Sequence, residues 1–215
     1  MHVISLVSNK GGSGKSTVSL CLAVAFQSRG FQTVVLDLDP QASSKEWHDA
    51  REVQYPHVES LHASRLPKAM EAVKDLGVEV VIIDTAPHTE ATALEAVKLA
   101  DLVIVPCQPS IMDIRGLAKT LQVLALVPGK PAYALMNGVQ HHSIQAATEA
   151  AVTIANHLKL PVAPLALGER VAFSRCMITG QTPQEIEPDG KAAKEIDHLY
   201  QWVRTQLQIE EREAA

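Results

Sequence analysis

Segment 9–17 constrains this chain more than any other. It reads Asn-Lys-Gly-Gly-Ser-Gly-Lys-Ser-Thr and follows directly on the apolar, β-branched run 3–7. Glycines let the backbone curl so that successive N–H groups point inward, where they can bind phosphate oxygens. A helical pattern begins at the end of the segment, and the positive N-terminal end of such a helix favours the same anion. The segment therefore predicts a strand, a phosphate-binding loop and a helix.

Two lysines lie in this loop, and we expect them to have different roles. Lys15 is placed to reach the β- and γ-phosphates of a nucleotide, and the hydroxyl of Ser16 is placed to ligate Mg²⁺. The ordinary phosphate-loop pattern has a glycine where this chain has Asn9, and the second lysine, Lys10, lies inside the loop. The extra lysine separates one branch of nucleotide-binding proteins from the generic ATPase.

Acidic residues mark the ends of two further apolar runs. Asp37 and Asp39 are two residues apart near the end of run 33–38, so they point to the same side of an extended strand. Beside a phosphate loop, such carboxylates could orient the attacking water and hold the water shell of a metal. One of the two could instead cap the helix that is predicted to follow. Asp84 follows the aliphatic run 78–83, an arrangement that directs an acid at Mg²⁺ from the sheet edge.

Apolar runs and helical patterns alternate along the chain. The apolar runs are continuous rather than alternating, which indicates that both faces of their sheet are covered. We therefore predict an α/β fold with a doubly wound, mostly parallel sheet flanked by helices. Strands are predicted at 3–7, 33–38, 78–83, 102–106, 132–136 and 160–166, and helices at 15–29, 43–51, 65–76, 89–99, 112–126, 143–158 and 190–210. Ligands of such sheets bind beyond the carboxyl ends of the strands, where the loop and the acids should converge.

Composition limits the class of protein. The 215 residues suit one nucleotide-binding domain spanning 1–215, and 47% hydrophobic with 4% aromatic residues is typical of α/β proteins. Because the net charge is −5, any contact with nucleic acid must come from a local basic patch. The three cysteines lack metal-ligand spacing, the N-terminus does not resemble a leader, and no apolar run approaches the ~20 residues that span a bilayer. We expect a cytoplasmic protein with free thiols and no membrane partner.

Three segments together resemble the deviant Walker ATPases of the ParA/MinD family. These segments are the loop from Lys10 to Thr17, Asp37-Leu-Asp39-Pro-Gln and Ile83-Asp84-Thr-Ala-Pro. The Asp-Pro-Gln triplet is typical of the ParA side, the bacterial DNA-partition ATPases. Trp47 and segments 101–110 and 189–196 are similar to short ParF-type proteins, which lack an N-terminal DNA-reading domain. Ile111 departs from that type, which has a proline there, so details of filament assembly do not carry over.

The resemblance implies a role for each matching residue. Lys10 matches the signature lysine that reaches across a dimer to the partner's ATP, and Asp39 matches the acid that positions the hydrolytic water. The residues implied to contact the nucleotide or its Mg²⁺ are Lys10, Gly11, Gly12, Ser13, Gly14, Lys15, Ser16 and Thr17, with Ser16, the switch acid Asp37 and the Walker B acid Asp84 beside the metal. Catalysis would rest on Lys10, Lys15 and Asp39. Dimerisation would depend on ATP, because each crossing lysine needs the other subunit's triphosphate.

Other candidate residues carry weaker signals. Asn137 follows an apolar run, where it could hydrogen-bond the adenine edge or form a turn ahead of Gly138. His48, on the helix after Asp39, is expected to face solvent. The basic residues of the C-terminal third include Arg170, Arg175, Lys191 and Lys194. ParA-like proteins bind DNA without sequence preference on this part of the surface, and a few phosphate contacts would give weak, salt-sensitive binding. The alternative is a solvated helix face on which acidic residues are interleaved.

These observations predict an ATP-dependent DNA-partition ATPase. It would use ATP and Mg²⁺, form an ATP-sandwich homodimer, bind DNA at the nucleoid and hydrolyse ATP slowly, because no arginine is evident in cis beside the γ-phosphate. The resemblance implies a small centromere-binding partner of the ParB/ParG kind, with a flexible basic arm. Three alternatives stay open: a ParA-like ATPase that positions a non-DNA cargo, an ATP-driven filament former, and a P-loop metabolic synthetase. The signature lysine and the Asp-Pro-Gln triplet argue against the last.

Overall fold

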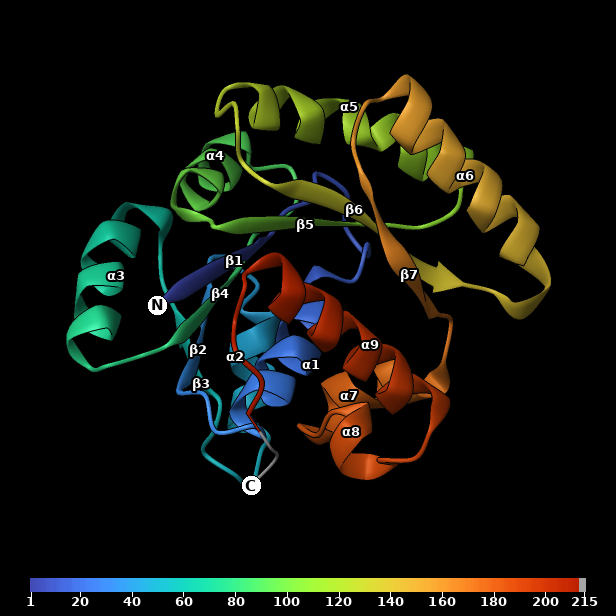
Figure 1. Cartoon of the computed structure of the whole chain (residues 1–215). Helices are drawn as coiled ribbons and strands as arrows, with labels where there is room; N and C mark the ends of the chain where they lie inside the picture. The colour runs from blue at the N-terminus through green and yellow to red at the C-terminus, as the bar shows by residue number, and fades with distance from the viewer. Residues whose placement is uncertain (213–215) are drawn as a thin grey trace.

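In the computed structural model, residues 1–212 are described, and they form a seven-stranded sheet between two layers of helices (Figure 1). The strands run in the order β3-β2-β4-β1-β5-β6-β7, and every neighbouring pair is parallel. Their bounds are β1 His2–Leu6, β2 Thr33–Asp37, β3 His57–Ser60, β4 Val80–Asp84, β5 Leu102–Cys107, β6 Ala132–Val139 and β7 Val162–Gly168. The predicted doubly wound α/β fold is confirmed.

Helices cover both faces of the sheet. In Figure 1, α3 to α6 lie on one face, and α1, α2 and α7 to α9 lie on the other. Their bounds are α1 Lys15–Gln27, α2 Ser43–Asp49, α3 Leu66–Asp75, α4 Glu90–Leu99, α5 Ile111–Ala125, α6 Ile144–His157, α7 Val171–Thr179, α8 Pro183–Ile186 and α9 Lys191–Gln206. Short 3₁₀ turns lie at Ala63–Arg65 and His141–Ser143. No helix within residues 1–212 is long and apolar enough to cross a membrane.

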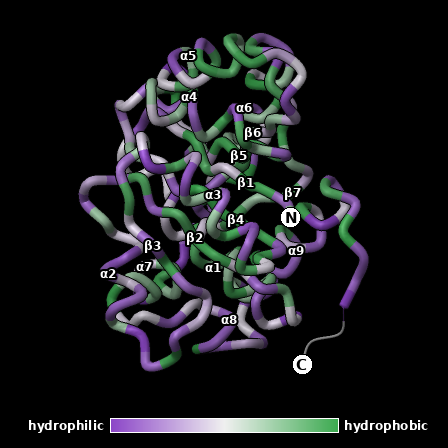
Figure 2. Tube along the Cα trace, turned by 90° about the vertical axis from the view of Figure 1, so that its left-hand side faces the viewer, coloured by the Kyte–Doolittle hydropathy of each residue, from purple (hydrophilic) through white to green (hydrophobic). Residues whose placement is uncertain are grey.

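Alternate residues of the central strands pack on opposite faces. Ile4 and Leu6 of β1 pack with α1 and α9, whereas Val3 packs in the separate cluster formed with α3 and α4. Each face therefore needs apolar residues, which is why the strand sequences are continuously apolar. Figure 2 shows this as hydrophobic stretches along the central strands and α1. Burying a single leucine or isoleucine side chain contributes about 1.5–3 kcal/mol, so these two clusters account for much of the stability.

Three elements were not predicted, and each lacks a strong apolar pattern. Strand β3 lies at the sheet edge and buries Val58 alone of its four residues. Helix α7 buries Cys176 alone, and α8 has only four residues. The prediction for His48 was wrong: its side chain is 8% exposed, and Nε2 lies 3.2 Å from the carbonyl oxygen of Gln54. The three cysteines are buried free thiols, as expected.

Arg51 joins α2 to the segment between α7 and α8. Its buried guanidinium donates to the carbonyl oxygen of Gly180 at 2.6 Å and to Glu185 at 2.7 Å. Gly180 ends α7 with φ +68, and a Cβ there would lie 2.8 Å from the backbone of Ala50 and Arg51. Glycine is thus required both for the left-handed conformation and for the close approach of the two helices.

This close approach predicts that Gly180→Ala destabilises the fold more than Gly30→Ala. Both positions have positive φ, so both variants lose about 1–2 kcal/mol from backbone strain. A Cβ at Gly30 meets nothing within 4 Å, whereas the one at Gly180 forces α2 and α7 apart, at a further cost of about 1–3 kcal/mol. Urea unfolding measures both free energies. Equal losses would contradict the packing argument.

Candidate functional site

The loop and the predicted acids meet at the carboxyl edge of the sheet. In the strand register, Asp37 of β2 lies opposite Asp84 of β4, and Asp84 lies opposite Leu6 of β1. The chain leaves β1 just beyond Leu6 and enters the glycine-rich loop before α1. Parallel pairing of three strands therefore places the loop beside two carboxylates that are far apart in sequence.

The loop has the backbone of an anion cradle. Gly12 and Gly14 have φ values of +73 and +95, and Gly14 precedes α1 without any side-chain cap on the helix N-terminus. The N–H groups of the first helical turn thus have no intrahelical or side-chain acceptor, which favours a bound anion. A Cβ at Gly11 or Gly12 would meet nothing within 4 Å, so the cradle is open on that side.

Asn137 holds the end of the loop. Its side-chain amide donates to the carbonyl oxygen of Ser13 at 2.8 Å, and a Cβ at Gly14 would lie 2.1 Å from its Nδ2. Asn137 lies within β6, which continues to Val139, so the turn interpretation of this residue is wrong. Its amide nitrogen positions the loop, and the residue also lines the adjoining cavity described below.

The two loop lysines are held differently. Lys15 is 6% exposed, and its Nζ donates to the carbonyl oxygen of Lys10 at 3.3 Å. Burial lowers the pKa of Lys15, while the nearby Asp84 and Asp39 charges partly restore it. The Nζ of Lys10 instead lies 2.5 Å from Oδ2 of Asp113, on α5. Lys15 therefore lies in the cradle, and Lys10 lies outside it.

The three predicted acids have distinct environments. Both oxygens of Asp37 accept backbone N–H groups, Oδ1 from Asp39 and Oδ2 from Ser44 and Lys45. The capping interpretation thus holds for Asp37, which accepts hydrogen bonds from backbone N–H groups in the first turn of α2. Asp39 is only partly buried, and its Oδ1 accepts from the backbone N–H of Gln41 at 2.9 Å. Water can reach that carboxylate.

Asp84 is fully buried with one oxygen unsatisfied. Its Oδ2 accepts from the hydroxyl of Ser44 at 2.8 Å, while Oδ1 has no hydrogen-bond partner among residues 1–212. Burial, and next the charge of Asp37, raise the pKa of Asp84 to about 7. The Asp84 carboxylate, with one oxygen unpaired, and the nearby Ser16 hydroxyl are a suitable donor set for Mg²⁺, which takes one or two protein ligands and keeps its other positions for water and phosphate. Ser16 and Asp84 fit the metal; the oxygens of Asp37 are already engaged.

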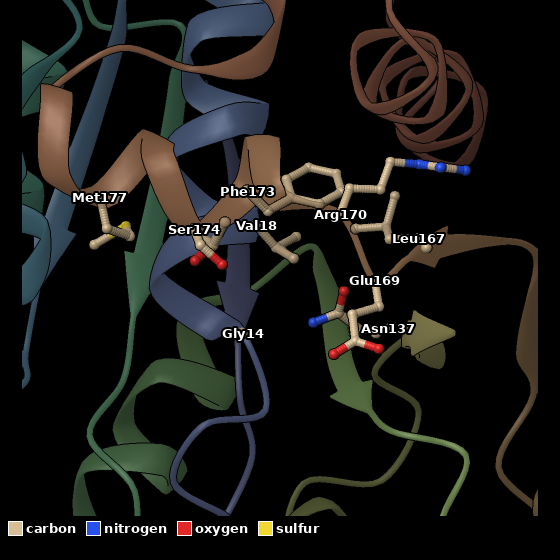
Figure 3. A pocket seen from close by; sticks show the side chains of 12 residues that line it. Gly14, Val18, Asn137, Leu167, Glu169, Arg170, Phe173, Ser174 and Met177 are labelled. Atoms are coloured by element: carbon tan, nitrogen blue, oxygen red, sulfur yellow. The ribbon is translucent and has the colours of Figure 1, made fainter. Parts of the chain in front are cut away.

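A cavity of about 320 Å³ adjoins the loop (Figure 3). It lies between the start of α1, the end of β6, the end of β7 and helix α7. Its lining comprises Gly14, Thr17, Val18, Asn137, Gly138, Leu167, Gly168, Glu169, Arg170, Phe173, Ser174 and Met177. Apolar walls with a few amide, hydroxyl and carboxylate groups suit a flat heteroaromatic base. The sequence predicted only Asn137 and the loop residues Gly14 and Thr17 as nucleotide contacts in this lining, because α7 has no clear helical pattern.

Comparison with known proteins gives the family. Residues 4–183 match the model described as the CobQ/CobB/MinD/ParA nucleotide binding domain. The chain belongs to this family. It is therefore one of the ParA/MinD-type nucleotide-binding ATPases, which confirms the resemblance inferred from the three segments.

Relatives and solved structures extend this likeness over most of the chain. The maintenance of carboxysome distribution protein A of Gloeobacter kilaueensis is 26% identical over 208 residues, 96% of this chain and 94% of its own. Protein ParA of Rhizobium radiobacter is 32% identical over 127 residues, 58% of this chain and 57% of its own. The septum site-determining protein MinD of Pyrococcus horikoshii, solved with Mg-ADP, has the same fold, with a TM-score of 0.76 over 97% of this chain and 98% of that one at 20% identity.

The basic residues expected to bind DNA in this ParA/MinD-type protein do not form one group. Arg170 lines the cavity, and its guanidinium is paired with Glu195 of α9 at 2.5 Å, so most of its charge is already compensated. Arg175, Lys191 and Lys194 are exposed. Arg170 therefore belongs with the cavity, and the other three are the residues available to an external partner.

Asp84 should make the free energy of unfolding of this protein depend on pH. Its pKa rises from 3.8 to about 7 on folding, so the folded state is favoured at low pH and loses that advantage as pH rises from about 4 through 7. In Mg²⁺-free, nucleotide-free protein we expect the unfolding free energy to fall over this range, at up to roughly 1.4 kcal/mol per pH unit. Asp84→Asn should flatten the profile, leaving a residual slope from Asp37, whose pKa burial also raises.

Urea titrations at several pH values measure this slope. Asp49→Asn serves as the control, because it removes an exposed carboxylate whose pKa is lowered by Lys45 rather than raised. Asp49→Asn should not flatten the profile. If the unfolding free energy of Asp84→Asn falls with pH as steeply as that of the wild type, folding does not raise the pKa of Asp84.

Proposed function

We propose that this protein is an ATP-dependent DNA-partition ATPase that forms an ATP-sandwich homodimer, binds DNA without sequence preference and hydrolyses ATP slowly. The observation that carries the proposal is the separation of the two loop lysines. Lys15 lies in the phosphate cradle, whereas the side chain of Lys10 is 42% exposed and lies against α5, outside it. A cation in that position is suited to a triphosphate held by another subunit.

The nucleotide would occupy the cradle and the cavity together. Its phosphates would lie against the N–H groups between Gly11 and Thr17 and the ammonium of Lys15, and its base between Val18 and Phe173. Ser16 and Asp84 would hold Mg²⁺, which neutralises charge between the phosphates. Asn137 would hold the loop beside the base cavity through its hydrogen bond to the carbonyl oxygen of Ser13.

Hydrolysis requires a group that orients water against the γ-phosphate. Asp39 has a carboxylate that water can reach, held in place by the N–H of Gln41, and its charge is close enough to Lys15 to affect the pKa of that lysine. These properties support Asp39 as the residue that orients the attacking water. Asp37, with both oxygens on backbone N–H groups, would act by holding α2 and Asp39 in place rather than as a direct ligand.

The surface around Lys10 supports association of two copies. Ile111 and Met112, at the start of α5 and next to Asp113, are 71% and 70% exposed. Large apolar side chains at this exposure are costly to solvate and are readily buried by a second protein surface. A homodimer formed here would bury them and bring each Lys10 to the other subunit's nucleotide.

The cargo distinguishes two versions of this function. DNA partition is supported by Protein ParA of Rhizobium radiobacter, together with the Asp-Pro-Gln triplet. A second candidate, positioning of a non-DNA cargo, is supported by the relative from Gloeobacter kilaueensis, which matches over nearly its full length. Both versions share the ATP chemistry and differ only in the partner. A small ParB/ParG-like protein would be the activating partner in the first, and co-purification with tagged protein distinguishes the two.

Separate roles for the two lysines predict different defects. Lys15→Ala should abolish ATP binding, because it removes the ammonium in the cradle, whereas Lys10→Ala should bind ATP nearly as tightly as the wild type but remain monomeric. Isothermal titration measures the first property, and sedimentation with a non-hydrolysable analogue measures the second. An ATP-dependent dimer of Lys10→Ala would contradict the role in trans.

The exposed basic residues should contribute to DNA binding. Replacing Arg175, Lys191 and Lys194 together with alanine should weaken binding of non-specific duplex and reduce the salt slope by up to about 0.9 for each phosphate that is no longer neutralised. The matched control is the triple alanine variant of Arg65, Lys68 and Lys74, exposed basic residues at and near α3 on the other helical layer. Fluorescence anisotropy at several salt concentrations gives both quantities. Equal effects of the two triple variants would place the DNA-binding surface elsewhere.

A further inference from the structure

The ammonium of Lys10 is paired within its own subunit. Its Nζ lies 2.5 Å from Oδ2 of Asp113, in the first turn of α5. The carboxylate side chain is only 3% exposed, whereas the lysine side chain is 42% exposed. A buried carboxylate needs a compensating partner, and Lys10 is the cation bonded to it in the described part of the chain.

We propose that Asp113 is a positioning residue for Lys10. It holds the lysine inside the nucleotide-free subunit, and this ion pair must break before Lys10 can reach a second copy's triphosphate. The strength of the pair therefore helps to set the ATP concentration at which two copies associate. This inference rests on the proposed ATP-dependent dimer.

Nucleotide binding in the same subunit is connected to this ion pair through the loop backbone. The carbonyl oxygen of Lys10 accepts a hydrogen bond from Nζ of Lys15 at 3.3 Å. A phosphate in the cradle competes with that carbonyl for the Lys15 ammonium. Loss of this hydrogen bond frees the peptide of Lys10, so an occupied cradle loosens the backbone that carries the paired lysine.

Formation of a symmetric dimer breaks one Lys10–Asp113 ion pair in each of the two subunits. If breaking one Lys10–Asp113 pair weakens association threefold, breaking one in each subunit weakens it about ninefold. Threefold corresponds to about 0.65 kcal/mol. Removing the carboxylate should therefore strengthen ATP-dependent association by roughly tenfold.

Asp113 also has a structural role, and the test must separate the two. Ser110 caps α5: its side chain accepts from the backbone N–H of Asp113 at 3.1 Å, and its hydroxyl donates to the Asp113 carboxylate. An acidic residue in the first helical turn also interacts favourably with the helix dipole. A purely structural role predicts a loss of stability in Asp113→Asn without any change at Lys10.

The first measurement uses the nucleotide-free protein and does not depend on dimerisation. An amine-reactive acylating reagent is applied in limiting amount, and the extent of reaction at Lys10 is followed by mass spectrometry. Asp113→Asn, which keeps the shape of the side chain but removes its charge, should raise the acylation rate of Lys10 several-fold. Ser110→Ala, which removes the cap but keeps the carboxylate, should leave the rate close to that of the wild type.

The second measurement is the dimer dissociation constant from sedimentation at saturating non-hydrolysable ATP analogue. Asp113→Asn should lower this constant by roughly tenfold, whereas the double variant Asp113→Asn with Lys10→Ala should stay monomeric, as Lys10→Ala does alone. Glu95→Gln is the charge-matched control, because it breaks the exposed Lys98–Glu95 pair on α4 and removes the same charge. It should not change the constant.

The outcomes separate the two proposals. A wild-type protein that stays monomeric with the analogue overturns the proposed dimer, whatever the acylation result. A wild-type dimer with unchanged acylation and unchanged dissociation constant in Asp113→Asn overturns the positioning role alone. Thermal unfolding of each variant confirms that it is folded, and Asp113→Glu, which restores the charge, should return the acylation rate towards that of the wild type.

Discussion

The site depends on two carboxylates placed opposite each other in neighbouring parallel strands. The register between β2 and β4 makes Asp37 and Asp84 neighbours, both fully buried, in a sheet with helices on both faces. Burying two carboxylates side by side is costly: burial first, and next the charge of Asp37, raise the pKa of Asp84. The fold tolerates it because the first turn of α2 donates two backbone N–H groups to Asp37 and the Ser44 hydroxyl to Asp84. The remaining oxygen of Asp84 has no hydrogen-bond partner among residues 1–212, and a divalent cation bound to it would offset the charge.

Helix α2 thereby connects the acids to the rest of the nucleotide site. At its start, Ser44 and Lys45 bind Asp37, and just beyond its end Arg51 binds the turn between α7 and α8. Helix α7 in turn lines the base cavity with Phe173. The acids and the wall of the cavity are therefore connected through one short, well-anchored helix.

The two loop lysines illustrate how similar residues acquire different roles. Lys15 opens α1 and is drawn into the cradle, where burial lowers its pKa. Lys10 lies five residues earlier on a turn that faces α5, so its ammonium meets Asp113. The two lysines are close in sequence, yet their ammonium groups have different partners. The difference arises from the neighbouring element that each side chain contacts.

The sequence by itself determined the fold class, the phosphate loop and the identity of the acids. Continuous apolar strands require two covered faces, and the positive φ values at Gly12 and Gly14 are ones that glycine adopts without strain. Both features therefore follow from the local sequence. Tertiary structure alone decided that Asp37 caps α2, that His48 is buried, that Arg170 pairs with Glu195 beside the cavity, and that Lys10 is held by Asp113. Helix α7, which lines the cavity, and the edge strand β3 could likewise not be predicted from the sequence. Each buries a single residue and so has no apolar pattern. The Lys10–Asp113 contact joins segments 103 residues apart and depends on strand register and helix packing, which no local pattern encodes.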